Sequence, residues 1–311
     1  LMDSLRIADR LEWLRGTSGY YADGTVYPLN SPGEILRYPL LTIPDKIRLA
    51  LLTMRARKMD STPLDRITAR DFVVREVGER VYRSFFEPLL TSKFGDRRDD
   101  ISAAWLVSRI AIRSNRGLSG ERLGYLKGGF FTLIEALSDE VGRHCVIRLQ
   151  DPATSLSREP YGWRVNGQRY DAVISTIPPH TVPGGVLSDL PGIPYQGAAC
   201  MLISLDHDVT SGIYWLNMKD PAPYGAVVAH TNFVPLERYG EHLVYLASYF
   251  QDTLPPRKDQ AMLDDFCQRF HVQPDHIRWH RMAVEQSAGP LYSTGFRERV
   301  LPYQEKGLFL A

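Results

Sequence analysis

The chain has 311 residues, of which 44% are apolar, and it is therefore long enough for two compact domains with a substantial core. Lys and Arg total 37 against 36 for Asp and Glu, so the composition excludes the strong basic field of a protein that holds nucleic acid or anionic lipid through bulk charge. No apolar run approaches the roughly 20 residues that span a bilayer, and we expect no transmembrane segment.

The first part of the chain, residues 1–120, is mainly helical in pattern. An Asp23-Gly24 pair between aromatic and β-branched residues at 20–28 predicts one β-hairpin. Farther on, Ile47, Ala50, Leu51 and Met54 follow the i, i+3, i+4, i+7 spacing of an amphipathic helix. Such helices also bind membranes, but we expect this apolar face to be buried in the protein.

A second helical region covers residues 69–112. Pro88 is expected to break or start a helix, which places Lys93 among aromatic residues at a helix end. If residues 101–112 are helical, Arg109 and Arg113 lie on one face and could together hold a carboxylate or phosphate. A solvated cationic face explains the same pair, and from spacing alone we favour it.

The central residues 125–179 change character. A glycine pair, Gly128-Gly129, opens a helix with an apolar face at Ile134, Leu137 and Val141. Because helix N-termini carry unsatisfied N–H groups, an anion or a flavin edge could lie there, although a simple turn explains the pair equally well. Residues 145–149 are expected to form a strand, Asn166-Gly167 a hairpin turn, and residues 172–174 a buried strand.

Residues 197–285 contain strand patterns in succession, with one helix near 257–270. The expected strands cover residues 199–205, 212–216, 226–230, 243–250 and 277–284. Neighbouring strands of this kind favour a largely antiparallel sheet. The predicted fold class is therefore α+β, with a helical region and a mixed, largely antiparallel sheet.

Three runs of sequence resemble the flavin-containing amine oxidase and protoporphyrinogen oxidase superfamily. They are GYLKGGF at residues 124–130, DAVISTIPP at residues 171–179 and LLTSKFG at residues 89–95. The last run is also similar, more distantly, to UDP-galactopyranose mutases. The DAVISTIPP run is the most specific of the three.

The resemblance implies the domain organisation. Residues 1–120 would be the mainly helical part of a substrate-binding domain, 121–186 the central segment of an FAD-binding domain, 187–290 the substrate-binding sheet, and 291–311 a return toward the FAD domain. The GxGxxG-type loop that opens such proteins is not found here, nor is their final FAD segment. We therefore expect an excised central piece, lacking the N- and C-terminal parts of its FAD domain and inactive alone.

The resemblance also assigns site residues. Gly128, Gly129, Ala153 and Pro178 would contact FAD. The small-molecule substrate would contact the side chains of Lys93, Phe94, Arg109, Arg113 and Tyr125. No catalytic acid or base is assigned, because the flavin would accept a hydride from the substrate while the protein orients it.

Two further hypotheses stay open. In one, the protein is a flavin-dependent mutase of nucleotide sugars. In the other, it is a non-catalytic module that binds a ligand or a protein between its helices and its sheet.

Metal-binding patterns are weak in this sequence. Cys145, Cys200 and Cys267 contain no CxxC pair, which argues against a thiolate zinc site and a disulfide framework, and with no secretion signal we expect a cytoplasmic protein. His276 and His280 fall in a strand pattern where their spacing does not converge, and Asp206-His207-Asp208 is expected to be a solvated turn. We therefore predict no metal.

Overall fold

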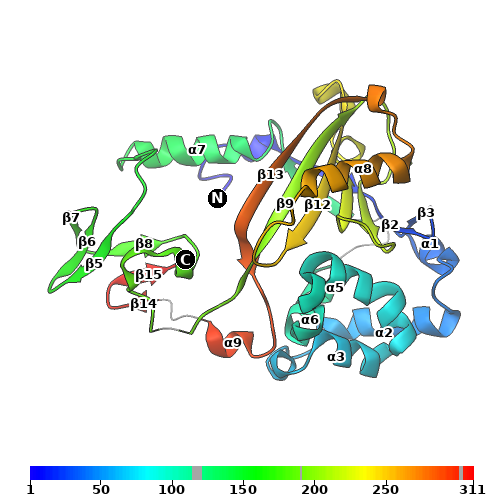
Figure 1. The fold of residues 1–311 in the computed structure, drawn as a ribbon, viewed down its shortest axis with the longest axis horizontal. Coiled ribbons are helices and arrows are strands. Elements are labelled where there is room, and N and C mark those ends of the chain that lie inside the picture. The colour runs from blue at the N-terminus through cyan, green and yellow to red at the C-terminus, as the bar shows by residue number, and fades with distance from the viewer. Residues whose placement is uncertain (114–120, 190, 301–303) are drawn as a thin grey trace. The chain divides into compact units, whose positions relative to one another are not determined.

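The computed structural model describes residues 1–113, 121–189, 191–300 and 304–311 (Figure 1). The chain forms two compact units. The first unit comprises Leu1–Glu12, Gly124–Pro194 and Phe296–Ala311, and the second comprises Trp13–Leu123 and Tyr195–Gly295. Helices and mixed, mostly antiparallel sheets confirm the predicted α+β class.

A seven-stranded sheet organises the second unit, in the order β13-β9-β12-β11-β10-β2-β3. Every neighbouring pair is antiparallel except β10 and β2. The strands are β2 (Ser18–Ala22), β3 (Thr25–Pro28), β9 (Tyr195–Leu205), β10 (Trp215–Met218), β11 (Ala226–Ala229), β12 (His242–Phe250) and β13 (Ile277–Pro290). These strands confirm the predicted succession, with β10 shifted toward the C-terminus of the expected residues 212–216.

The predicted hairpin at residues 20–28 is confirmed. Asp23 and Gly24 both have positive φ angles, 52° and 72°, and they join β2 to β3. Such a two-residue turn matches the twist of the strands that it connects.

One face of the sheet is covered by α8 (Lys258–Phe270), which crosses β9 and β12 in Figure 1. Met262 and Phe266 of α8 are fully buried against alternate residues of the strands, such as Met201 and Leu246. Because side chains alternate along a strand, the residues between these buried positions belong to the opposite face.

The helices of the second unit other than α8 form a separate core, into which Tyr20 of β2 also packs. They are α1 (Pro32–Arg37), α2 (Ile43–Ala56), α3 (Ala69–Val77), α4 (Glu79–Val81), α5 (Glu87–Phe94) and α6 (Ala103–Arg113). Pro88, expected to break or start a helix, lies in the first turn of α5, which directly follows a π-helical segment at Tyr82–Phe86. No helix in the described residues is long and apolar enough to cross a bilayer.

The predicted α2 helix is confirmed, but the prediction of its buried face is wrong. Ile47, Leu51 and Met54 are exposed, whereas Leu52 and Ala56 are buried against the other helices. The helix carries two apolar rows, and periodicity cannot tell which of them meets the core.

The first unit contains α7 (Phe131–Gly142) and two small three-stranded sheets, in the orders β5-β6-β7 and β14-β15-β8. Their strands are β5 (Leu156–Glu159), β6 (Gly162–Val165), β7 (Gln168–Tyr170), β8 (Val173–Ser175), β14 (Gln304–Glu305) and β15 (Leu308–Leu310), and α9 (Phe296–Arg299) precedes β14. The Asn166-Gly167 turn between β6 and β7 is confirmed. The strands β1 (Leu11–Gly16) and β4 (Glu121–Leu126) pair with each other, and the division between the units falls within both.

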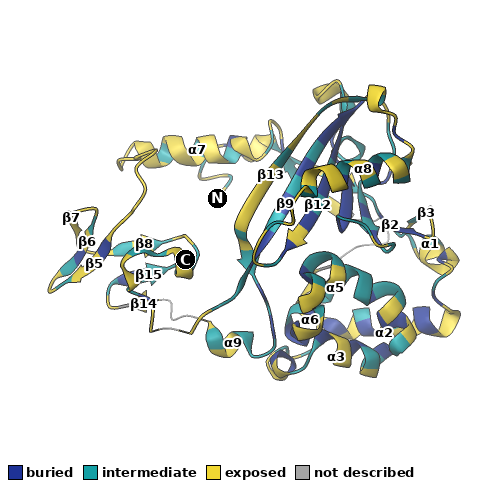
Figure 2. Ribbon diagram, in the orientation of Figure 1, coloured by how far each residue is buried: buried dark blue, intermediate teal, exposed yellow. Residues whose placement is uncertain are grey.

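Two predictions about the first unit are wrong. Residues 145–149 are not a strand, because no strand in the described part of the chain pairs with them, and apolar residues alone do not hold an extended segment. The strand at β8 forms, in parallel with β15, but Ile174 is 71% exposed rather than buried. Figure 2 shows α7 largely in the colour of exposed residues. Its apolar residues Ile134 and Val141 are 48% and 44% exposed.

Candidate functional site

A lysine among aromatic rings marks the strongest candidate site, which lies within the second unit. The Lys93 ammonium, at the end of α5, is 5.0 Å from the ring centroid of Tyr249, 5.7 Å from that of Trp105 and 5.8 Å from that of Phe94. Phe94 and Trp105 meet edge to face at 4.8 Å. A cation within about 6 Å of ring faces is attracted by their quadrupoles, so the rings hold the ammonium in place.

Arg109 brings a second cation to this site. It lies one turn after Trp105 on α6, and its guanidinium carbon is 5.7 Å from the Trp105 ring centroid. Burial, and then the charge of Arg109, lowers the pKa of Lys93. Among the described residues, neither cation has a hydrogen bond or an ion pair with a carboxylate. Two neighbouring positive charges without an acidic partner can accept an anionic group.

The face of the sheet opposite α8 provides an apolar surface beside these cations. On β12, Tyr245, Ala247 and Tyr249 point to this face, opposite Leu202, Cys200 and Ala198 of β9. Tyr249 is 37% exposed, and the other five of these residues are partly buried. The residues that alternate with them along both strands are buried. Burial raises the pKa values of Tyr245, Tyr249 and Cys200, so these groups stay neutral.

A histidine and a tyrosine adjoin the same face at its β11 end. His230 Nε2 lies 3.1 Å from the Tyr239 hydroxyl, and its ring centroid is 5.8 Å from that of Tyr245. Burial lowers the pKa of His230, which favours the neutral imidazole. Sequence reasoning missed both residues, since neither belongs to a motif: His230 ends an expected strand, and Tyr239 stands alone.

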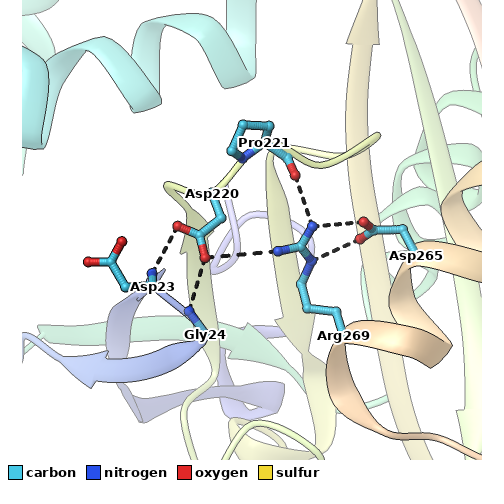
Figure 3. Close-up of polar contacts among 6 residues, drawn as sticks. All are labelled: Asp23, Gly24, Asp220, Pro221, Asp265 and Arg269. Atoms are coloured by element: carbon cyan, nitrogen blue, oxygen red, sulfur yellow. Dashed lines mark hydrogen bonds and ion pairs between the residues drawn. The ribbon is translucent and has the colours of Figure 1, made fainter.

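A surface hollow of about 400 Å³ is lined by Thr91 and Ser92 of α5 and also by Tyr249. Its wall includes Asp220 and Pro221, which belong to the network drawn in Figure 3. Asp220 accepts hydrogen bonds from the Asp23 and Gly24 amides at 2.9 and 3.1 Å. Arg269 of α8 donates to both oxygens of Asp265 and to the Pro221 carbonyl. The network ties the hairpin turn, the β10–β11 connection and α8 together, so we interpret it as structural.

The structure therefore brings together Lys93, Phe94 and Arg109 of the predicted substrate residues. Arg113 is the last residue of α6, and its side chain lies outside the described residues. Tyr125 belongs to the first unit, on β4. These two assignments stay predictions.

The glycine pair of the first unit lies directly before the start of α7. Gly128 and Gly129 have φ angles of 87° and 81°, which glycine adopts readily. A Cβ atom on Gly128 would lie 2.7 Å from Thr132 Oγ1, whereas one on Gly129 would make only an ordinary contact, 3.7 Å from the Tyr125 hydroxyl. Among the described residues, no side chain caps this helix end, but the amides of Gly129, Thr132 and Leu133 already donate to the carbonyls of Leu126, Gly129 and Phe130. The predicted cofactor role of the glycine pair stays a prediction.

Ala153 lies in an exposed segment that Asn166 anchors on both sides. Asn166 Oδ1 accepts hydrogen bonds from the Thr154 and Ser155 amides at 2.9 and 3.1 Å, and Asn166 Nδ2 donates to the Pro152 carbonyl at 2.8 Å. The hairpin turn thus fixes the backbone at Ala153. The predicted cofactor role of Ala153 stays a prediction.

Pro178, the fourth predicted cofactor residue, directly precedes a short 3₁₀ turn at Pro179–Thr181. Its carbonyl accepts hydrogen bonds from the Thr181 amide and hydroxyl. Among the described residues, no hydrogen bond joins Gly128 or Gly129 to Ala153 or Pro178.

Solved structures with the same fold include oxidoreductases. A protein from Exiguobacterium sp. 255-15, provisionally assigned as a protoporphyrinogen oxidase, is 19% identical with a TM-score of 0.73, over 100% of this chain and 78% of its own. A reduced UDP-galactopyranose mutase is 14% identical with a TM-score of 0.67, over 96% of this chain and 70% of its own. An oxidoreductase from Methanosarcina mazei is 14% identical with a TM-score of 0.66, over 99% of this chain and 78% of its own.

No curated protein matches the chain in sequence. The model of the flavin-containing amine oxidoreductase family, however, matches residues 1–294. This match covers nearly the whole chain and confirms the family expected from the sequence. The chain belongs to the flavin-containing amine oxidoreductase family.

Proposed function

We propose that these residues are the substrate-binding part and a central FAD-domain segment of an FAD-dependent oxidoreductase, of the amine oxidase or protoporphyrinogen oxidase kind. The family match over residues 1–294 carries this proposal, because the family is defined by flavin chemistry. When bound, the flavin supplies the redox chemistry by accepting a hydride from a small organic substrate.

The second unit supplies substrate recognition in this proposal. Lys93 and Arg109 bind an anionic group of the substrate, either a carboxylate or a phosphate. The aromatic and aliphatic residues of β9 and β12 then hold an apolar body beside it, where they exclude water. Arg113 and Tyr125 complete the proposed set.

The first unit contributes cofactor contacts. The uncapped start of α7, with Gly128 and Gly129, would face a polar edge of FAD. The segment held by Asn166 would present the Ala153 backbone, and Pro178 would lie at the end of the strand that follows.

The visible spectrum of the purified full-length protein tests the flavin assignment. We expect the absorbance of oxidised flavin, either directly or after FAD is added, and we expect it to bleach when a substrate is oxidised without oxygen. A colourless protein that no flavin restores would contradict the proposal. A coloured protein that no substrate bleaches would instead favour a non-catalytic binding module.

A second candidate function is a flavin-dependent mutase of nucleotide sugars. The fold similarity to UDP-galactopyranose mutase, with a TM-score of 0.67, motivates it. In that case the two cations would bind a diphosphate. Calorimetric titration with a uridine diphosphate sugar decides between the two functions, because only the mutase requires saturable binding of that ligand.

A further inference from the structure

Three potential metal ligands lie close together at one end of the large sheet, although Asp206 and His276 are 70 residues apart in the sequence. β9 ends at Leu205, and β13 begins at Ile277, its register partner. Asp206 and His207 directly follow β9, and His276 directly precedes β13. These residues therefore lie beside one another. The Asp206 amide also donates a hydrogen bond to the His276 carbonyl at 3.3 Å, which fixes the two segments against each other.

The side chains face one another across this junction. The Asp206 carboxylate lies 2.5 Å from His207 Nδ1 through one oxygen and 2.7 Å from His276 Nδ1 through the other. The two imidazole centroids are 4.9 Å apart. One ligand atom from each of the three residues lies within 4.8 Å of the other two.

Two imidazole nitrogens and one carboxylate oxygen are a ligand set that suits Zn²⁺, with metal–ligand distances of about 2.0–2.2 Å. Small rotations of the three side chains suffice to reach those distances, because the backbone already holds them together. All three side chains are partly exposed, so water can complete the coordination. The next acidic residue, Asp208, is not available as a ligand, because Thr210, Gly212 and Asn232 all donate to it.

We propose that Asp206, His207 and His276 form a binding site for a divalent transition-metal ion, with Zn²⁺ as the expected occupant. The ion would link the end of β9 to the start of β13 and so stabilise that edge of the sheet. It would have no part in the flavin reaction. The sequence hypotheses grouped His276 with His280, and Asp206 and His207 with Asp208, whereas the structure joins Asp206 and His207 to His276.

Titration with ZnCl₂ after removal of metals by a chelator tests this site. We expect one saturable ion per chain by calorimetry, and a melting temperature that rises with Zn²⁺. Removing a residue that only orients a metal ligand weakens metal binding about 10–100-fold. Because His276→Ala and Asp206→Asn alter the ligands themselves, each should weaken Zn²⁺ binding by roughly 100-fold or more. Circular dichroism without metal checks that the variants fold, and His276→Gln provides a second, conservative variant.

His280→Ala is the matched control. His280 is exposed on β13, four residues after His276, and it does not belong to the cluster. This variant should bind Zn²⁺ as the wild type does. The proposal is overturned if the wild type shows no saturable site, or if His276→Ala and Asp206→Asn bind Zn²⁺ as tightly as His280→Ala does.

Discussion

The Lys93 ammonium lies 5.0 Å from the centroid of the Tyr249 ring, so the end of α5 and strand β12 meet through a cation and an aromatic face. This contact joins the helical core to the exposed face of the sheet. It also places a positive charge where burial makes that charge unfavourable. We therefore expect Lys93 to serve binding at the expense of stability.

The first prediction concerns the effect of the Lys93 charge on stability. Because the folded-state pKa of Lys93 is lowered, the unfolded chain binds more protons between that pKa and the usual 10.5. Stability should therefore rise as the pH increases through this window, and the penalty should be fully present below the folded-state pKa. Lys93→Met should raise the melting temperature at pH 7, measured by scanning calorimetry. A lower melting temperature of the variant would show that the cation–π contacts outweigh the burial.

The second prediction compares two neighbouring leucines of α2. Leu52 is 2% exposed in the helical core and Leu51 is 52% exposed. Leu52→Ala should lower the free energy of unfolding by about 2–5 kcal/mol, because it leaves a cavity. Leu51→Ala should change it by less than about 0.5 kcal/mol. Chemical denaturation of both variants measures the difference, and equal losses would show that the outer row of α2 is buried as well.

The third prediction concerns a glycine that lets α5 approach the sheet. A Cβ atom on Gly225, just before β11, would lie 1.6 Å from Ser92 Oγ and 2.9 Å from Ser92 Cα. Gly225→Ala should therefore push α5 outward and destabilise the fold by about 1–3 kcal/mol, as overpacking does. The control is Gly33→Ala, since nothing lies within 4 Å of a Cβ atom there. If the two variants unfold at the same denaturant concentration, α5 does not pack as described.

The fourth prediction concerns the Asn166 anchor. Asn166→Gly retains a residue that tolerates the φ angle of 47° but removes the side-chain hydrogen bonds to residues 152–155. The Thr154 and Ser155 amides should then exchange hydrogen faster, with about 1 kcal/mol of local protection lost for each bond. Asn166→Asp keeps the acceptor oxygen and should retain most of the protection. Unchanged exchange in Asn166→Gly would mean that the turn alone orders the segment.

Local signals predicted the local structure well. The Asp23-Gly24 and Asn166-Gly167 pairs fix both hairpin turns, and Pro88 marks the start of α5, because each of these residues restricts its own backbone. These features depend on a few neighbouring residues, which a sequence displays directly.

Features that depend on distant partners could not be predicted. The buried row of α2 is selected by the helices packed against it, and residues 145–149 lack the neighbouring strand that an extended segment needs. Asp206 and His276 are 70 residues apart, and only the register of β9 with β13 brings them together. Likewise, His230 and Tyr239 gain their environment from β12.

The most direct test of the proposed substrate site is the binding of an aromatic carboxylate. Calorimetric titration of the full-length protein with benzoate should show saturable binding, weakened roughly tenfold to a hundredfold in Lys93→Met and in Arg109→Met, because each removes a charged partner worth about 1.5–3 kcal/mol. Lys58→Met, which removes an exposed charge just beyond α2, should bind benzoate as the wild type does. Absence of saturable binding, or equal affinity in all three variants, would contradict the assignment of Lys93 and Arg109 to the substrate site.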